Sequence, residues 1–145
     1  MPDWKKNSLD LRLHHIGCAV TSIEQGLAIY RDGMGFDRIS PAVEITSQKV
    51  EVCFVEASPD VYLELVAPLS EDSPVGSFLK RRQHYYHICH ETPSVPDTIA
   101  HLTKQGFRQL SLFDSEAFNG QPCAFLLSPA LALVELCTSG SFTLL

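Results

Sequence analysis

The sequence has few basic residues, with 11 Lys and Arg against 17 Asp and Glu and a formal net charge of −6. Its only basic run, Lys80-Arg81-Arg82, is too short to form the positive patch that nucleic-acid binding needs. No apolar stretch approaches the roughly 18 residues that span a bilayer, and residues 1–6 lack the apolar core of a signal peptide. We therefore expect neither nucleic acid nor a membrane as a partner.

The sequence also lacks a Cys-x-x-Cys pair, and its cysteines are odd in number. Even numbers or closely spaced pairs are typical of disulfide frameworks and zinc sites. The cysteines lie mostly within apolar runs, at Cys18, Cys53, Cys89, Cys123 and Cys137. We expect buried, reduced thiols in a cytoplasmic protein.

Composition indicates a globular chain of about one domain, because 45% of the 145 residues are hydrophobic and 19% are charged. We expect an α+β fold, with an N-terminal tail at 1–10 and a single domain at 11–145. Within the domain, the hydrophobic patterns predict two modules of the same order: a strand, a helix and three strands. The expected bounds are about 11–68 for module one, 69–83 for a connector helix and 84–138 for module two.

Local signals support this order. Ser22 is a typical N-cap residue for the helix of module one. Apolar residues at helical spacing then predict one buried face, made of Ile23, Leu27, Tyr30 and Met34. The expected strands are 12–20, 37–46, 49–56 and 60–67 in module one, and 85–91, 107–113, 122–128 and 131–137 in module two.

The two modules also repeat in sequence. His15 and His87 lie 72 positions apart. In the last strands the offset is 71, and Leu63-Glu64-Leu65 matches Val134-Glu135-Leu136. Self-similarity at a fixed period is the signature of an internal repeat. Each module therefore has a His on its first strand and a Glu on its last.

The repeated Glu residues stand between apolar neighbours. For either one alone, a side chain on the solvated face of its strand is the simpler interpretation. A buried carboxylate costs several kcal/mol unless it is paired or ligated. If the modules pack with twofold pseudo-symmetry, both carboxylates converge with both repeated imidazoles, a suitable set for a borderline divalent ion such as Co, Zn, Ni or Mn. We predict a metal site formed by His15, Glu64, His87 and Glu135.

The remaining histidines are expected around this site or at the surface. Strand alternation predicts that His14 lies on the opposite face of its strand from His15. His84, His90 and His101 have no partner in the repeat.

The repeat resembles the vicinal oxygen chelate superfamily, from Leu13 to about Cys137. Within it, the chain is most similar to the methylmalonyl-CoA epimerase branch. The similar segments are His14–Val20, Leu63–Leu69, Glu71–Val75, His87-Ile88, Asn119–Pro122 and Val134–Leu136. The resemblance implies two paired βαβββ modules that form a half-barrel cleft, and it places the family's metal ligands at the four residues that the repeat selects.

The resemblance also implies a chemistry. The chain is expected to be a metal-dependent epimerase or isomerase that removes a proton next to a thioester carbonyl. Glu135 would both ligate the metal and act as a catalytic acid–base group. The substrate would be an acyl thioester such as methylmalonyl-CoA, and the chain would form a homodimer.

Three segments depart from the epimerase pattern, and one of them is the loop 116–121, which is less basic than the Gly-x-His-Gly-Lys loop of many relatives. Some relatives have a second catalytic Glu on the third strand, where this chain has Val52. The adjacent Glu51 is the candidate for that role, although strand alternation places it on the opposite face, and Glu44 is further off. The sequence therefore leaves the second base unplaced. The family's His-Pro-Lys segment is here 127–130, which contains no Lys. If that Lys helps to hold a coenzyme A tail, this chain binds the tail differently or not at all.

Other functions of the superfamily stay open. A glyoxalase I-like lactoylglutathione lyase would use the same four ligands. A non-haem iron oxygenase would use three of them and leave Glu64 without a role. A small-molecule-binding or drug-resistance protein of this fold would typically have lost the ligands, which are all present here.

Overall fold

The computed structural model describes residues 9–145, so residues 1–8 of the expected N-terminal tail lie outside it. The strands are β1 (Arg12–Ala19), β2 (Val43–Ile45), β3 (Val50–Ser58), β4 (Val61–Pro68), β5 (Tyr85–Thr92), β6 (Arg108–Ser115), β7 (Gln121–Leu127) and β8 (Leu133–Thr138). The α-helices are α1 (Ile23–Leu27), α2 (Val75–Lys80) and α3 (Val95–Lys104). The π-helix η1 (Ala28–Gly33) continues α1, and η2 (Thr46–Gln48) and η3 (Glu116–Phe118) are single 3-10 turns.

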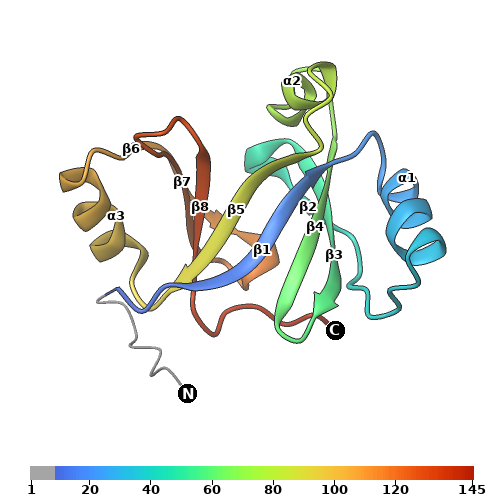
Figure 1. Ribbon diagram of the computed structural model, residues 1–145, viewed down its shortest axis with the longest axis horizontal. Coiled ribbons are helices and arrows are strands. Elements are labelled where there is room, and N and C mark those ends of the chain that lie inside the picture. The colour runs from blue at the N-terminus through green and yellow to red at the C-terminus, as the bar shows by residue number, and fades with distance from the viewer. Residues whose placement is uncertain (1–8) are drawn as a thin grey trace.

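All eight strands form one curled sheet, in the order β2-β3-β4-β1-β5-β8-β7-β6. The first strands of the two modules, β1 and β5, are antiparallel neighbours at its centre (Figure 1), and each is parallel to the last strand of its own module. Ile16 pairs with Ile88, its own equivalent in the repeat, so an approximate twofold axis passes near this pair. The predicted α+β fold of two βαβββ modules in a half-barrel is confirmed.

The helices close the core of each module at opposite ends of the molecule (Figure 1). Buried Leu27 and Tyr30 pack against β3 and β4, and buried Val95 and Ile99 pack against β7 and β8. Between these two cores lie the central strands β4, β1, β5 and β8, which bear Glu64, His15, His87 and Glu135.

The helix of module one differs from the prediction. It is an α-helix only to Leu27, and then continues as the π-helix η1. A π-turn holds more residues than an α-turn, so the face that an α-helical spacing predicts is lost beyond it. Tyr30 is buried as expected, but Met34 is 61% exposed, and its predicted place on the buried face was wrong.

The predicted strand at 37–46 is reduced to β2 at Val43–Ile45. Upstream of β2, Ile39 forms only an isolated bridge with Val55. Pro41 stands between these two pairings and has no N–H to donate to a strand ladder.

All five cysteines are buried and free, as predicted. Within residues 9–145 no helix has the length and apolar character that crossing a membrane requires.

Gly26 gives a test of the packing between α1 and the sheet. A Cβ added there would lie 2.8 Å from Cδ1 of Leu65, a fully buried side chain, and 3.2 Å from Cγ1 of Val20. Gly→Ala in a helix normally stabilises, but Gly26→Ala should lower the free energy of unfolding by roughly 1–3 kcal/mol through overpacking. Urea denaturation measures it. Gly76→Ala in α2 is the control, because its Cβ would meet only an oxygen at 3.9 Å. A Gly26→Ala variant at least as stable as the wild type would contradict the packing.

Candidate metal centre

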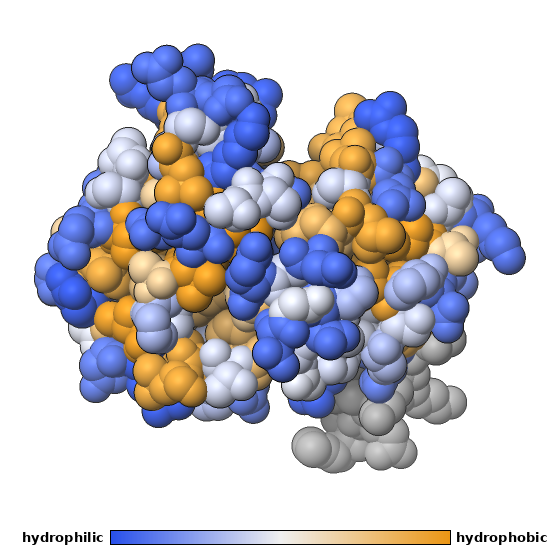
Figure 2. Space-filling model, turned by 180° about the vertical axis from the view of Figure 1, so that it is seen from behind, coloured by the Kyte–Doolittle hydropathy of each residue, from blue (hydrophilic) through white to orange (hydrophobic). Residues whose placement is uncertain are grey.

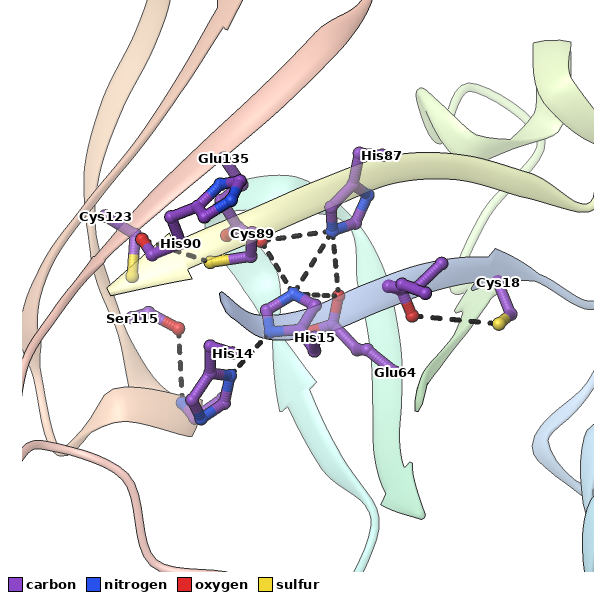
Figure 3. A network of polar contacts seen from close by, with 12 residues as sticks. His14, His15, Cys18, Glu64, His87, Cys89, His90, Ser115, Cys123 and Glu135 are labelled. Carbon is purple, nitrogen blue, oxygen red and sulfur yellow. Dashed lines mark hydrogen bonds and ion pairs between the residues drawn. The ribbon is translucent and has the colours of Figure 1, made fainter. Parts of the chain in front are cut away.

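Four side chains from the four central strands meet at one point (Figure 3): His15 from β1, Glu64 from β4, His87 from β5 and Glu135 from β8. All four are buried, and one ligand atom from each lies within 4.8 Å of the others. The Nε2 atom of His15 lies 3.2 Å from Nε2 of His87 and 2.9 Å from Oε1 of Glu135. These are the four residues predicted from the repeat.

Strand register explains the convergence. In the parallel β1–β4 pair Gly17 lies beside Glu64, and in the parallel β5–β8 pair Cys89 lies beside Glu135. Across the antiparallel centre, Gly17 pairs with His87 and Cys89 pairs with His15. Gly17 and Cys89 are themselves equivalent in the repeat. The twofold relation between the modules therefore brings each module's His to the other module's Glu as well as to its own.

The spacing of the ligand atoms fits a bound cation. An ion held at about 2.1 Å by each ligand sets neighbouring ligand atoms about 3.0 Å apart in octahedral and about 3.4 Å apart in tetrahedral geometry. The distances from the two Nε2 atoms to each other and to the two Oε1 atoms range from 2.9 to 3.4 Å. A divalent ion of ordinary radius matches these edges.

The pKa values of the clustered residues also bear on ion binding. Burial opposes ionisation of His15, but Glu64 and Glu135 outweigh it and raise the pKa of His15 to about 10. Burial likewise opposes charge on Glu64 and Glu135, yet the two imidazoles lower the pKa of both carboxyls. Without an ion, protonated imidazoles therefore balance the two carboxylates, and a divalent cation would bind by displacing those protons.

Hydrogen bonds alone cannot account for all the close contacts between the four side chains, whereas a bound cation can. The Nε2 atom of His15 carries at most one hydrogen. Around it stand Nε2 of His87, Oε1 of Glu135 and, at 3.3 Å, Oε1 of Glu64. One proton serves one or two of these contacts, whereas an ion at the centre contacts all four side chains.

His14 corrects the prediction from strand alternation. The β1–β5 register shifts between Leu13 and His15, which marks a β-bulge. His14 is consequently buried beside His15, with the two Nδ1 atoms 2.8 Å apart, and does not lie on the opposite face (Figure 3). Burial, together with the neighbouring His15, lowers the pKa of His14 to about 3.

The other histidines stay outside the cluster. His84 contacts the carbonyl oxygen of Ala19 through Nδ1 and the hydroxyl of Tyr30 through Nε2. His90 is half-buried on β5, and His101 is exposed on α3. His101 thus lies at the surface as expected, whereas half-buried His84 packs on Tyr30.

A cavity of about 400 Å³ opens at the cluster, with Glu64 and Glu135 in its wall. The rest of the wall is mostly apolar. Seen from behind (Figure 2), a notch at the top separates two lobes that show apolar side chains on both flanks. Val50 and Val52 of β3 line the cavity, but Glu51 between them does not. The structure therefore does not bring Glu51 to the four clustered residues.

Sequence reasoning did not single out the four other polar residues of the cavity wall, Gln48, Ser77, Tyr86 and Ser111. The ring of Tyr86 lies 4.5 Å from that of His87, and the Ser111 hydroxyl is buried with no hydrogen-bond partner among the described residues. Tyr86 precedes a predicted ligand in the sequence, which is a usable signal. Gln48 on the turn η2 and Ser111 on β6 come from different modules, and only the fold brings them to one cavity.

Comparison with known proteins defines the class. The sequence model of the Glyoxalase/Bleomycin resistance protein/Dioxygenase superfamily matches residues 14–125. The chain therefore belongs to this superfamily.

Its relatives include methylmalonyl-CoA epimerases. The chain is 32% identical over 127 residues to the mitochondrial methylmalonyl-CoA epimerase of Mus musculus, covering 86% of this chain and 68% of the relative. It is 35% identical over 130 residues to the uncharacterized protein YqjC of Bacillus subtilis, covering 87% and 91%. A variant of Streptomyces coelicolor methylmalonyl-CoA epimerase in complex with 2-nitronate-propionyl-CoA superposes with a TM-score of 0.74 at 28% identity, covering 89% and 97%.

Proposed function

We propose that this protein is a metal-dependent epimerase that abstracts the proton α to the thioester carbonyl of an acyl-CoA, with methylmalonyl-CoA as the first candidate. The observation that carries the proposal is the buried cluster of two imidazoles and two carboxylates, of which Glu64 and Glu135 line a cavity. Relatives and structural neighbours named as methylmalonyl-CoA epimerases support the substrate class.

In this proposal His15, Glu64, His87 and Glu135 hold the ion. When bound, a divalent ion supplies Lewis-acid stabilisation of the charge that develops on the carbonyl oxygen. Glu135 takes the α-proton, since it is a carboxylate at the cavity wall and the resemblance gives its equivalent this role. The apolar side chains around it exclude water, which strengthens each electrostatic contact inside the cavity.

The returning proton needs a second donor. Glu51 is not assigned this role because it lies on the face of β3 that points away from the cavity. Among the described residues that line the cavity, Glu64 and Glu135 are the only carboxylates. The second acid–base group is therefore sought among Glu64, the Tyr86 hydroxyl and water.

Solvent deuterium exchange tests the proposal. Protein loaded separately with Co, Zn, Ni or Mn is incubated in D₂O with methylmalonyl-CoA, and incorporation at the α-carbon is followed by mass spectrometry. We expect about one divalent ion per chain and exchange that stops when a chelator removes the ion. Absence of exchange with any acyl-CoA by metal-loaded protein would sink the epimerase assignment.

A glyoxalase I-like activity is the second candidate, because it requires the same four ligands. The hemithioacetal of methylglyoxal and glutathione is the discriminating substrate in the same assay. A binding protein without catalysis is disfavoured by the retention of all four clustered residues. The homodimer and the cytoplasmic location stay predictions.

A further inference from the structure

His14 lies against the side of His15 that faces away from the proposed ion. The two Nδ1 atoms are 2.8 Å apart, and both residues are buried. His15 directs its other nitrogen, Nε2, toward His87, Glu64 and Glu135. The hydrogen between the two Nδ1 atoms therefore decides what His15 can do at Nε2.

Only one arrangement of that hydrogen suits metal binding. A neutral imidazole carries its proton on one nitrogen and a lone pair on the other. If the shared hydrogen belongs to Nδ1 of His15, then Nε2 has a free lone pair for a metal ion, and Nδ1 of His14 is the acceptor. If it belongs to His14, the proton of neutral His15 occupies Nε2 and blocks ligation.

We propose that His14 is a positioning residue that accepts a hydrogen bond from Nδ1–H of His15 and so holds Nε2 of His15 ready to ligate a divalent ion. This inference rests on the proposed metal centre. A ligating histidine usually makes this second contact to a carboxylate, a carbonyl or water. A neutral imidazole orients the ligand without adding negative charge to a cluster that already contains two carboxylates.

Packing holds His14 in place for this task. Its ring lies 4.6 Å from the ring of Phe142, 5.0 Å from Tyr62 and 5.2 Å from Phe118. Its Nε2 atom has no hydrogen-bond partner among the described residues. That is where His14 carries its own proton if Nδ1 is the acceptor. The aromatic surroundings leave this N–H against ring faces and edges, where it makes at most weak contacts.

The second histidine of the cluster is held differently. Nδ1 of His87 is buried and has no hydrogen-bond partner among the described residues. His14 thus supplies to one ligand a contact that the described residues do not supply to its symmetry mate. Loss of His14 should therefore affect the metal ion through His15 alone.

Two substitutions separate an orienting role from a packing role. His14→Phe keeps a ring among the aromatic side chains but removes the acceptor. His14→Asn loses the ring but can place Oδ1 where Nδ1 stood. We expect His14→Phe to weaken the binding of Co²⁺ or Zn²⁺ by about 10- to 100-fold, the usual cost of losing such a contact, and His14→Asn to weaken it less. Chelator competition measures both dissociation constants, and the visible spectrum of bound Co²⁺ reports the ligand geometry.

Packing alone predicts the reverse order, with His14→Phe close to the wild type and His14→Asn worse. That order, or wild-type affinity in both variants, would overturn the role of His14. Nitrogen-15 NMR of the zinc-loaded wild type needs no variant to fold, and should show a protonated Nδ1 on His15 and an unprotonated Nδ1 on His14. A protonated Nδ1 on His14 contradicts the inference. If the wild type binds neither ion, the metal centre itself fails, which is distinct from a failure of His14 alone.

Discussion

Replacing Glu135 with Gln should lower the rate of α-proton exchange by at least about 100-fold, because an amide cannot take the proton that a positioned carboxylate takes. The amide oxygen still offers a ligand atom in place of Oε1, which lies 2.9 Å from Nε2 of His15 and 3.1 Å from Nε2 of His87. We therefore expect Glu135→Gln to bind a divalent ion more weakly, as Glu64→Gln should, but to lose most of the exchange even when saturated with metal. Metal content and deuterium incorporation are measured on the same samples.

Glu64→Gln is the matched control for this prediction. Glu64 is buried like Glu135, occupies the equivalent strand position and lines the same cavity. If it serves as a ligand only, its amide variant should bind metal more weakly but keep most of the exchange rate once saturated with metal. Equal losses in the two variants would mean that the carboxylates share the proton transfer. Wild-type exchange in Glu135→Gln would remove Glu135 from the chemistry.

The four clustered residues could be predicted because the repeat carries their information twice. A single Glu64 between two leucines has an ordinary surface interpretation. However, Glu64 recurs as Glu135, and His15 recurs as His87. If the two modules pack with twofold pseudo-symmetry, these four residues form one site. Hydrophobic patterns predict the order of elements along the chain but not that symmetry, which the antiparallel pairing of β1 with β5 supplies.

What could not be predicted depends on pairing between distant strands. The bulge that turns His14 toward His15 is visible only in the register of β1 against β5. The π-helix that exposes Met34 likewise leaves no mark in the spacing of apolar residues. The apolar wall of the cavity comes from both modules, and the curl of the sheet decides which strand faces line it. Glu51 differs in this respect, because strand alternation alone places it on the face opposite Val52, and it does not line the cavity.

The two histidines of the cluster are positioned by different means, although the repeat makes them equivalent. His15 is contacted at Nδ1 by His14. His87 lies over Gly17, where a Cβ would be 2.1 Å from its Cε1 and 2.2 Å from its Nδ1. The equivalent of Gly17 in module two is Cys89, which has a side chain. The absence of a side chain at Gly17 therefore makes the place for one imidazole, and a neighbouring imidazole orients the other.

Gly17→Ala should consequently damage the metal centre although residue 17 offers no ligand atom. The added Cβ cannot coexist with the present ring of His87, which also lies against Tyr86 and Phe125 at 4.5 and 5.2 Å between ring centroids. Either the ring moves away from the ligand position or β1 shifts from β5. We expect affinity for a divalent ion to fall by at least about 100-fold, more than the loss of an outer contact costs, and unfolding free energy to fall by roughly 1–3 kcal/mol.

Chelator competition and urea denaturation measure the two effects of Gly17→Ala separately. Gly76→Ala serves as the control, because a Cβ there makes only ordinary contact. Gly26→Ala provides a second comparison, since it should lose stability by crowding Leu65, whose side chain lies on the opposite face of β4 from Glu64, and should keep its metal affinity. A loss of stability without a loss of metal affinity in Gly17→Ala would show that His87 is not held over Gly17 when the ion is bound.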